Sequence, residues 1–438
     1  MQSAKPLARE ACRDYELRER TMTSCPFSNL LDPDTYKDGM PYDMLRDIRH
    51  AGPVVRMEDP LTGVPYWVVT RIKDIDTVSK NPTLFSSEQR SAFPMEMDDD
   101  TVAIQRNQII CMDPPRHQKV RRIVRNAFTP KRVDSYAPAF REHARRIIDA
   151  VASKGECEFV EDVAAELPLI SILELLGVPL EDRKQFFNWT NTMIFADDPD
   201  MATSIDEAQH AAIEVISYAM HLAEKHRTEP MDNITSALLD GDIDGEPVTP
   251  DMFGWMFILI LVGGNESTRT VMAQGMRLLM ENPDQLQYLI DNPDKVPNAV
   301  EEMLRYNTAF IAMRRTAMED TELGGQHIKK GDKIVLHYHT ANHDEDVFGA
   351  DAMRFDVTRA ERMPDLYNQL RSFGIGQHFC IGTHLARLEL NVMFDELLPR
   401  LRNPQFVGEP SYVRSFFVNA MKQMHIRFDP EGGDARVA

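Results

Sequence analysis

Apolar residues recur at helical spacing over most of this chain. In the clearest segments they return every three or four positions, and proline or clusters of glycine, aspartate and asparagine bound the run. These segments cover residues 140–151, 213–225, 253–282, 297–306 and 383–401. Pieces typical of strands are short, at 54–56, 66–69 and 333–336. The pattern predicts a mainly α, α+β protein with a small sheet region.

No linker or repeat divides the chain. It has 438 residues, of which 43% are hydrophobic, enough to bury a large core. Composition shifts little along its length, and no stretch rich in Gly/Ser or Pro separates two parts. We therefore expect one domain over 1–438, with a flexible segment at 1–28 and a frayed polar tail at 429–438.

Charge and cysteine content argue against several classes of protein. The formal net charge of −20 argues against nucleic acid as a partner. The longest apolar run, 255–262, is far below the roughly 18 residues of a membrane span. We therefore expect no membrane anchor. The cysteines include no CxxC pair that would indicate a disulfide framework or a zinc ribbon, so we expect a cytoplasmic protein. The cysteines are Cys12, Cys25, Cys111, Cys157 and Cys380.

A glycine-rich loop at 373–382, reading FGIGQHFCIG, presents one cysteine directly before a predicted helix. The partial positive charge of a helix N-terminus and nearby backbone N–H groups favour the thiolate of Cys380. The glycines at 374, 376 and 382 leave a surface without side chains, on which a flat ligand can lie. This combination suits iron in a planar macrocycle.

Two simpler explanations compete for this loop. A lone cysteine is most often a small buried hydrophobe. Gly374 and Gly376 also match half of a dinucleotide-binding loop, but Phe379 stands where that motif needs glycine and no predicted strand runs straight into Gly374. A thiolate ligand for iron accounts for more of the loop than either explanation.

The long helical segment at 253–282 is interrupted by Gly263, Gly264, Glu266, Ser267 and Thr268. Each glycine inside a helix costs roughly 1 kcal/mol relative to alanine, so the pair needs a reason. One reason is a close helix crossing beside a solvated Glu266. The other is space for a small ligand, with Glu266 and Ser267 hydrogen-bonding a chain of water molecules.

Charged residues form further patterns. Glu302 and Arg305 are three residues apart and share a helical face, which alone indicates a surface ion pair of little energetic value. The stretch 116–132 carries only basic charges, and it is either a solvated face or a docking surface. Its cations are Arg116, Lys119, Arg121, Arg122, Arg125, Lys131 and Arg132.

These motifs, in this order, resemble the soluble bacterial type of the cytochrome P-450 superfamily. The chain shows its His-x-x-x-Arg element at 117–121, Gly-Gly-x-Glu-Ser at 263–267, Glu-x-x-Arg at 302–305 and Phe-x-x-Gly-x-His-x-Cys-x-Gly at 373–382. The segment 341–348 is similar to Ala-Asn-Arg-Asp-x-x-x-Phe, with His343 in place of arginine. The resemblance implies a triangular fold, with a helix-rich domain and a small β-sheet domain.

The resemblance also implies a haem b cofactor and roles for residues. Cys380 would be the iron ligand, Gly263 and Gly264 would border the oxygen site, and Glu266 with Ser267 or Thr268 would serve proton delivery. Ser267 replaces the usual threonine, and its hydroxyl, lacking the methyl group, should be less rigidly aimed. The expected haem contacts are His117, Arg121, Arg315 and His378 at the propionates, with Phe373, Gly374 and Gly382; the expected supporting residues are Glu302, Arg305 and Arg359.

The implied activity is insertion of one oxygen atom from O2 into a C–H bond of a hydrophobic molecule such as a terpenoid, a steroid or lipid, or an aromatic hydrocarbon. Electrons would come from NAD(P)H through a ferredoxin and its reductase, and the enzyme would be a monomer. A peroxide-driven peroxygenase and a non-enzymatic haem sensor or carrier are the alternatives. The expected pocket residues are Leu261, Val262, Phe310, Ile311, Ala312, Phe416 and Phe417.

Overall fold

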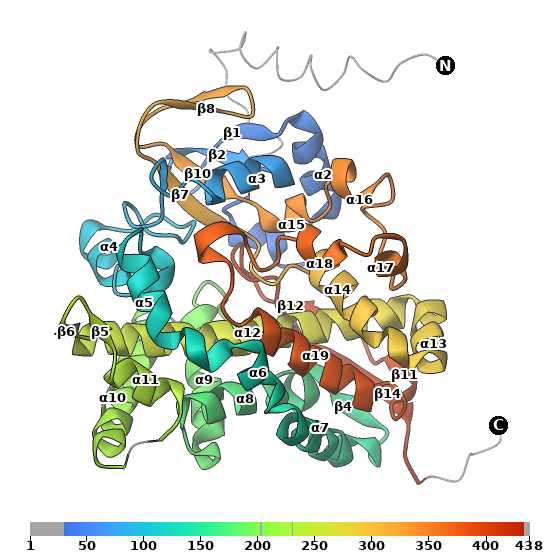
Figure 1. Ribbon diagram of the computed structural model, residues 1–438. Coiled ribbons are helices and arrows are strands. Elements are labelled where there is room, and N and C mark those ends of the chain that lie inside the picture. Colours follow the sequence, from blue (N-terminus) through green and yellow to red (C-terminus); the bar gives the residue numbers. More distant parts are fainter. Residues whose placement is uncertain (1–29, 202–203, 230, 433–438) are drawn as a thin grey trace, which may run out of the picture.

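The computed structural model describes residues 30–201, 204–229 and 231–432. The segment 1–28 that we expect to be flexible lies outside these residues, as does 433–438 of the expected tail. The molecule is narrow at an end rich in strands and broad at a helical end, as Figure 1 shows. The helix α12 (Pro250–Glu281) crosses the middle between the two ends.

The helix-rich character predicted from the apolar spacing is confirmed. Helices of eight residues or more are α2 (Tyr42–Ala51), α3 (Ile72–Ser79), α5 (Arg116–Arg125), α7 (Ala137–Ala152), α8 (Glu166–Leu176), α9 (Arg183–Ile194), α10 (Ile205–Thr228), α12, α13 (Pro283–Asp291), α14 (Val296–Tyr306) and α19 (Thr383–Leu397). Shorter helices are α4 (Asp99–Gln105), α6 (Pro130–Asp134), α11 (Ile234–Leu239), α15 (Tyr338–Ala341), α16 (Glu345–Phe348), α17 (Arg359–Arg362) and α18 (Leu366–Gln369). Single turns are η1 (Pro33–Tyr36), η2 (Ile109–Cys111), η3 (Asn126–Phe128), η4 (Val160–Ala164), η5 (Leu180–Asp182), η6 (Pro293–Lys295) and η7 (Gly376–His378).

Helix ends follow local chemistry. The hydroxyl of Thr249 accepts the backbone N–H of Met252, and Pro250 occupies the first turn of α12, where its missing N–H costs nothing. The prediction of a helix to residue 401 is wrong, because α19 ends at Leu397. Pro399 contributes to this end, since it has no backbone N–H with which to continue the helical hydrogen bonds, although Leu398 before it keeps helical geometry.

The strands form one five-stranded sheet and several small ones. The large sheet has the order β1-β2-β10-β7-β3, with β10 parallel to β2 and the other neighbours antiparallel. All three predicted strands, 54–56, 66–69 and 333–336, lie within it. The strands are β1 (Val54–Glu58), β2 (Pro65–Val69), β3 (Phe85–Ser86), β4 (Glu156–Glu158), β5 (Asp242–Ile243), β6 (Glu246–Pro247), β7 (Met313–Ala317), β8 (Thr321–Leu323), β9 (Gln326–Ile328), β10 (Lys333–Leu336), β11 (Arg402–Phe406), β12 (Ser411–Tyr412), β13 (Met421–Gln423) and β14 (His425–Asp429).

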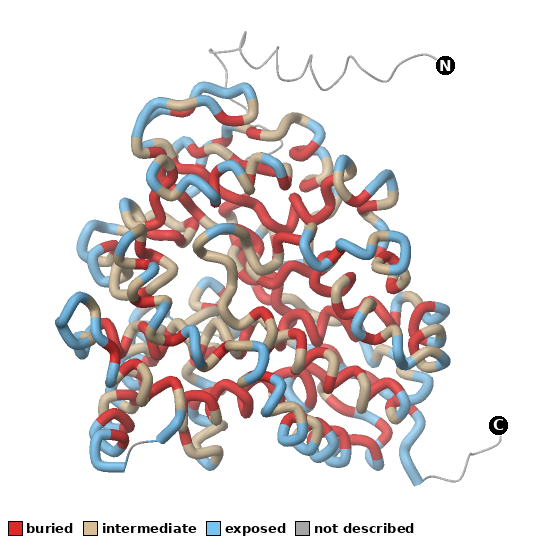
Figure 2. Tube along the Cα trace, in the orientation of Figure 1, coloured by how far each residue is buried: buried red, intermediate tan, exposed pale blue. Residues whose placement is uncertain are grey.

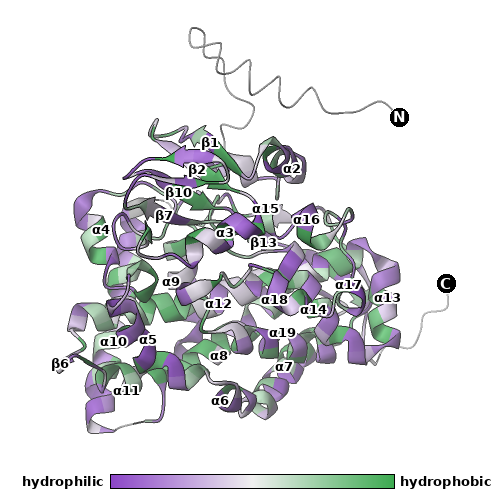
Figure 3. Ribbon diagram, turned by 45° about the horizontal axis from the view of Figure 1, so that its top comes forward, coloured by the Kyte–Doolittle hydropathy of each residue, from purple (hydrophilic) through white to green (hydrophobic). Residues whose placement is uncertain are grey.

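The core lies along α12. Figure 2 colours most residues of α12 and many of α19 as buried, and Figure 3 shows hydrophobic residues along α8. The apolar residues of α12 and α19 pack in one cluster with those of α8 and α14. A second apolar cluster lies under the large sheet against α3. Among the helices that the structure describes, none has both the length and the apolar character of a membrane span.

Candidate active site

A cavity of about 550 Å³ lies beside the middle of α12. Its walls come from α12, from the cysteine loop 373–382, from α5 and from β7, so segments far apart in the sequence meet there. It brings together most of the predicted site residues. Those that line it are His117, Arg121, Val262, Gly263, Gly264, Ser267, Thr268, Phe310, Arg315, Phe373, Gly374, His378, Cys380, Gly382 and Phe417.

The cysteine loop holds Cys380 at the cavity wall. The backbone N–H of Cys380 donates to the carbonyl of Phe373 at 2.9 Å, which closes the loop on itself. Gly382 follows as the N-cap of α19, so the cysteine stands just ahead of a helix N-terminus, as the sequence predicts. The residue is half-buried, and it lines the cavity.

The expected thiolate is only partly supported by the surroundings of Cys380. The N–H of Gly382 and the cations Arg121 and Arg387 lower the pKa of this thiol. Burial is the larger effect, and the net pKa is raised above its ordinary value. A helix N-terminus and two arginines are therefore insufficient alone, and a metal ion bonded to the sulfur is what would keep it deprotonated.

The glycines of the loop differ in their purpose. Gly374 lines the cavity and has φ 66°, in the left-handed region that favours glycine, so its backbone conformation requires glycine there. Gly376 does not line the cavity, which corrects our expectation for it. A Cβ there would lie 2.5 Å from the carbonyl oxygen of Ser79, so this glycine permits contact with α3.

Four cationic or potentially cationic side chains gather on one side of the cavity. Arg121 and His117 come from α5, Arg315 from β7 and His378 from the cysteine loop. The rings of His117 and His378 lie 4.4 Å apart, and a guanidinium N–H of Arg121 donates to the carbonyl of Phe379 at 2.6 Å. The sequence predicts this group from three separate segments, and the fold assembles it.

This cationic group has no negative partner in the part of the chain that the structure describes. Within the described residues, neither Arg121 nor Arg315 forms an ion pair, and Nδ1 of His117 is buried without a hydrogen bond. Burial and the two arginines lower the pKa of His117 to about 4. Buried polar groups normally have partners, so the arrangement fits a dianionic ligand such as the two propionates of haem b.

Gly263 and Gly264 serve one purpose each. A Cβ on Gly263 would meet nothing within 4 Å, so this position opens into the cavity. A Cβ on Gly264 would lie 2.6 Å from Cδ1 of Ile172, which is buried on α8. Gly264 also lines the cavity, but its missing side chain permits a close helix crossing. Of the two explanations for the pair, each applies to one glycine.

Alanine substitutions separate these two roles. Gly264→Ala should lower the free energy of unfolding, because overpacking costs about 1 to 3 kcal/mol and the helix preference of alanine returns only about 1. Gly263→Ala should leave stability equal or higher and weaken ligand binding, since its methyl group enters the cavity. Thermal unfolding and ligand titration measure both effects. Equal changes in both variants would contradict this division.

Ser267 and Thr268 both line the cavity. The hydroxyl of Ser267 donates to the carbonyl of Gly263 at 2.8 Å, one helical turn earlier. This bond restricts the rotamer, so the hydroxyl is better held than the loss of the threonine methyl suggests. Its single hydrogen is engaged there, and the oxygen remains free to accept a hydrogen bond from the cavity.

Glu266, which we expect to serve proton delivery, does not line the cavity. It is fully buried beside α9, where its carboxylate forms an ion pair with Arg269 at 2.7 Å and accepts a bond from Asn265 at 2.9 Å. Burial raises its pKa, while Arg269 and Thr190 oppose that rise. One residue along a helix turns a side chain by about 100°, which is why Ser267 faces the cavity and Glu266 does not.

Four of the expected pocket residues belong to the core. Leu261 packs in the main cluster, and Ile311, Ala312 and Phe416 pack in a third apolar cluster, together with Tyr66 and Val335. None of them lines the cavity. Each of them is adjacent in sequence to a residue that lines the cavity, and adjacent residues of a helix or strand point to different sides.

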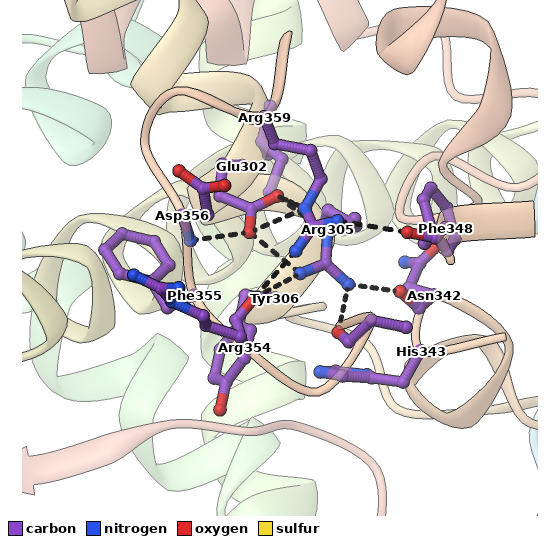
Figure 4. Close-up of polar contacts among 12 residues, drawn as sticks. Glu302, Arg305, Tyr306, Asn342, His343, Phe348, Arg354, Phe355, Asp356 and Arg359 are labelled. Atoms are coloured by element: carbon purple, nitrogen blue, oxygen red, sulfur yellow. Dashed lines mark hydrogen bonds and ion pairs between the residues drawn. The ribbon is translucent and has the colours of Figure 1, made fainter. Parts of the chain in front are cut away.

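Glu302, Arg305 and Arg359 form a buried triad, which Figure 4 shows. The carboxylate of Glu302 contacts Nε of Arg305 at 2.7 Å and Nε of Arg359 at 3.0 Å. Both guanidinium groups also donate to backbone carbonyls, including those of Asn342 and Phe348. The pair that looked like a surface ion pair from spacing alone is therefore fully buried and completed by the predicted arginine.

His343, which stands where the family motif has arginine, is buried close to the triad. Its ring lies 5.0 Å from that of Tyr306 and 5.7 Å from that of Tyr42. Burial, aided by His339 and Arg305, holds its pKa well below the ordinary value. His343 is thus neutral and does not replace the charge of the arginine.

Two residues near the site were missed from sequence. The guanidinium of Arg387 lies 4.5 Å from the ring centre of Phe373 and pairs with Glu301 at 2.5 Å, which braces the cysteine loop. Glu389 is fully buried on α19, and burial holds its pKa well above the ordinary value. A signal existed for the glutamate: it lies four residues after Leu385, on the apolar face of the predicted helix.

Comparison with known proteins gives a consistent result. The model of the family described as cytochrome P-450 matches residues 182–405. The chain is 36% identical over 414 residues to a steroid C26-monooxygenase of Rhodococcus jostii, covering 93% of this chain and 86% of the relative. It is 34% identical over 410 residues to a linalool 8-monooxygenase of Pseudomonas putida, covering 92% and 99%. A Mycobacterium marinum cytochrome P-450 in complex with pseudoionone superimposes with a TM-score of 0.81 at 32% identity, covering 88% and 94%.

Proposed function

This chain belongs to the cytochrome P-450 family and is a haem-thiolate monooxygenase that uses haem b, and on that premise we propose that Cys380 is the iron ligand. The observation that carries this assignment is the meeting of Cys380, an unpaired cationic group and the open position Gly263 in one cavity. His117, Arg121, Arg315 and His378 hold the propionates, and Phe373, Gly374 and Gly382 border the macrocycle. Glu302, Arg305 and Arg359 support the loop.

Bound haem supplies the oxidation, because a thiolate ligand pushes electron density toward the iron and favours O–O cleavage. The protein supplies position and proton control. Ser267 is the candidate donor at the cavity. Its hydroxyl hydrogen is bonded to the carbonyl of Gly263, so a proton leaves Ser267 only when that bond yields or when water replaces it. Thr268 is a second hydroxyl on the same wall.

The substrate that we propose is an apolar terpenoid or steroid-like molecule. The walls away from the cationic group are made by apolar side chains, among them Phe93, Ile110, Trp255, Val262 and Phe417. A cavity of this kind selects apolar molecules. The names of the relatives are in keeping with it, since one acts on a steroid and another on linalool.

Ligand titration tests this substrate class. Terpenoids and steroids should shift the Soret band of the ferric protein, whereas polar molecules of equal size should not. Turnover with reduced ferredoxin should exceed turnover with peroxide alone. A spectrum indifferent to all apolar ligands would favour a sensor or carrier, and equal rates with peroxide would favour a peroxygenase.

The electron donor that we propose is a small acidic ferredoxin docking on α5. Arg121 on this helix bonds to the cysteine loop, so the helix lies against the proximal side of the site. Arg122 and Arg125 are exposed on it, and neither makes an ion pair within the described residues. Other members of the basic stretch are engaged: Lys119 pairs with Asp244, and Arg132 pairs with Asp232 at 2.6 Å.

Neutralising this surface should slow reduction. Arg122→Gln with Arg125→Gln is expected to lower the second-order rate of reduction by ferredoxin about tenfold at low salt, because charge steering raises association rates. Stopped-flow reduction over a series of salt concentrations measures it. The control is Arg402→Gln with Arg427→Gln, two exposed arginines on β11 and β14. An equal fall in the control, or no dependence on salt, would contradict the assignment.

We also propose that residues 1–438 act as one domain and as a monomer in the cytoplasm. The exposed large apolar side chains of the described residues come from scattered segments, including Leu61, Ile213 and Val407. Cys111, Cys157 and Cys380 are free thiols, as a reducing compartment favours. Sedimentation at micromolar concentration would test the monomer.

A further inference from the structure

Two glutamine side chains in the cavity wall have polar atoms without a hydrogen-bond partner among the residues that the structure describes. Gln108 is only 4% exposed, lines the cavity, and its amide makes no hydrogen bond to any described residue. Gln105 also lines the cavity, and its Oε1 is buried and unpartnered. Buried amides are almost always hydrogen-bonded, so two such groups in one wall call for a partner that comes from outside the chain.

The backbone places both amides on one fixed turn. Gln105 is the last residue of α4, whose first turn is capped by the side chain of Asp98. The backbone N–H of Gln108 donates to the carbonyl of Gln105 at 2.9 Å. The next residue, Ile109, contacts Sδ of Met256 on α12 through its backbone N–H at 3.3 Å. The turn that carries Gln105 and Gln108 is therefore held against α12, and this contact fixes the position of the two side chains in the cavity wall.

The other polar side chains of the wall are engaged elsewhere or exposed; among them, Thr268 interacts with Glu389 and Tyr338 with Ser79. His117, Arg121, Arg315 and His378 form the cationic group assigned to the propionates. Ser267 donates to Gly263, and Ser372 donates to the carbonyl of Leu304 at 2.5 Å. Gln209 lines the cavity from α10 but is exposed. Gln105 and Gln108 are thus left for a ligand other than haem.

The surroundings of the two amides determine which kind of ligand group they can bind. Apart from the cationic group, no charged side chain of the described residues lines the cavity. The wall around the turn is apolar, with Met97, Ile109, Ile110 and Met256. An amide there can donate to a carbonyl or exchange hydrogen bonds with a hydroxyl, whereas a carboxylate would be buried without a cation to neutralise it.

We propose that Gln105 and Gln108 form a polar subsite that binds a neutral oxygen, hydroxyl or carbonyl, of an otherwise apolar substrate. This inference rests on the proposed function and adds to it the chemistry of one end of the substrate. Anchoring that oxygen fixes the rest of the skeleton in the cavity, so the subsite also determines which C–H bond is oxidised.

Matched ligands on one skeleton test the subsite in the haem-loaded enzyme. The acyclic set is geraniol, geranic acid and the dimethyloctadiene that lacks their oxygen; the cyclic pair is androstanone and androstane. Spectral titration gives the dissociation constants for the wild type and for Gln105→Met, Gln108→Met and the mouth control Gln209→Met. Methionine matches glutamine in length and cannot replace its hydrogen bonds. The carbon monoxide spectrum of each variant checks that it is folded and loaded.

The wild type should prefer geraniol and androstanone over the hydrocarbons. Gln108→Met should weaken binding of those two oxygenated ligands roughly 3- to 10-fold, the range for one neutral hydrogen bond, without weakening the hydrocarbons. Gln209→Met should change the binding of neither the oxygenated ligands nor the hydrocarbons. Gln108→Met should oxidise its substrate at more carbon positions than the wild type.

Three results would overturn the subsite alone: hydrocarbons that bind the wild type as tightly as alcohols, an oxygen preference that survives in both inner variants, or geranic acid as the tightest ligand of its set. A protein whose spectrum responds to none of the ligands would overturn the proposed substrate class, and the subsite with it. Should Gln108→Met fail to load haem, the wild-type preferences and Gln105→Met decide the question.

Discussion

Cys380→Ser is expected to abolish monooxygenase activity, reducing it to background, together with the carbon monoxide Soret band typical of sulfur-ligated haem. Cys380 is the only thiol among the described residues that line the cavity. A serine oxygen at this place lacks the electron-donating character that favours O–O cleavage. Haem should still bind, because the cationic group that includes Arg121 and Arg315 does not depend on the sulfur. Carbon monoxide difference spectra and product formation with ferredoxin measure both effects.

Cys157→Ser is the matched control. Cys157 is a buried free thiol on β4, away from the cavity, and burial raises its pKa to about 12. Its replacement should leave the Soret band and the rate per haem unchanged. A Cys380→Ser protein that keeps the sulfur-type band would show that another side chain holds the iron. The assignment of this loop, and of the cavity as the reaction site, would then be wrong.

Features of the site that depend on short sequence spacing could be predicted. The cysteine ahead of a helix, the His117 and Arg121 pair and the Glu302 and Arg305 pair each lie within a few residues, and local geometry places them correctly. Strand β7 could not be found in this way. Arg315 was expected at the site only through the family resemblance. Both Arg314 and Arg315 are buried, because Glu96 pairs with one and the cavity receives the other.

Direction around a helix was the other source of error. Gly263 and Gly264 differ in role because one faces the cavity and the other faces Ile172, and only the position of α8 tells which. Leu261 and Glu266 turn away from the cavity for the same reason. Periodicity shows that a helix has a buried face, but α12 is buried nearly all round, so the pattern contains no information about which neighbour each side chain meets.

A chain of polar contacts connects the buried triad to the cysteine loop. Arg305 donates to the carbonyl of Asn342, whose side chain in turn donates to the hydroxyl of Ser372 at 2.8 Å and accepts the backbone N–H of Arg371 at 2.6 Å. Ser372 is followed directly by Phe373, whose carbonyl accepts the backbone N–H of Cys380. The triad does not line the cavity, but the loop that carries Cys380 is anchored to the triad through these contacts.

Glu302→Gln should therefore destabilise the fold by about 3 to 5 kcal/mol, the cost of removing one partner from a buried ion pair. Glutamine keeps the shape of the side chain but leaves the buried Arg305 without a negative partner, and leaves Arg359 with only the partly exposed Asp351 at 3.4 Å. Because the cysteine loop is anchored through Arg305, haem content should fall together with stability. Urea unfolding and the ratio of haem to protein measure the two consequences.

The chain offers a control of the same residue types and spacing. Glu224 and Arg227 are also three residues apart on a helix, at 2.5 Å, but their side chains are 68% and 58% exposed. Glu224→Gln should change the free energy of unfolding by less than about 1 kcal/mol and leave haem content as it is. If the two variants behave alike, burial is not what gives the triad its strength. If Glu302→Gln loses stability but keeps its haem, the link from the triad through Asn342 to the cysteine loop is not what holds the cofactor site together.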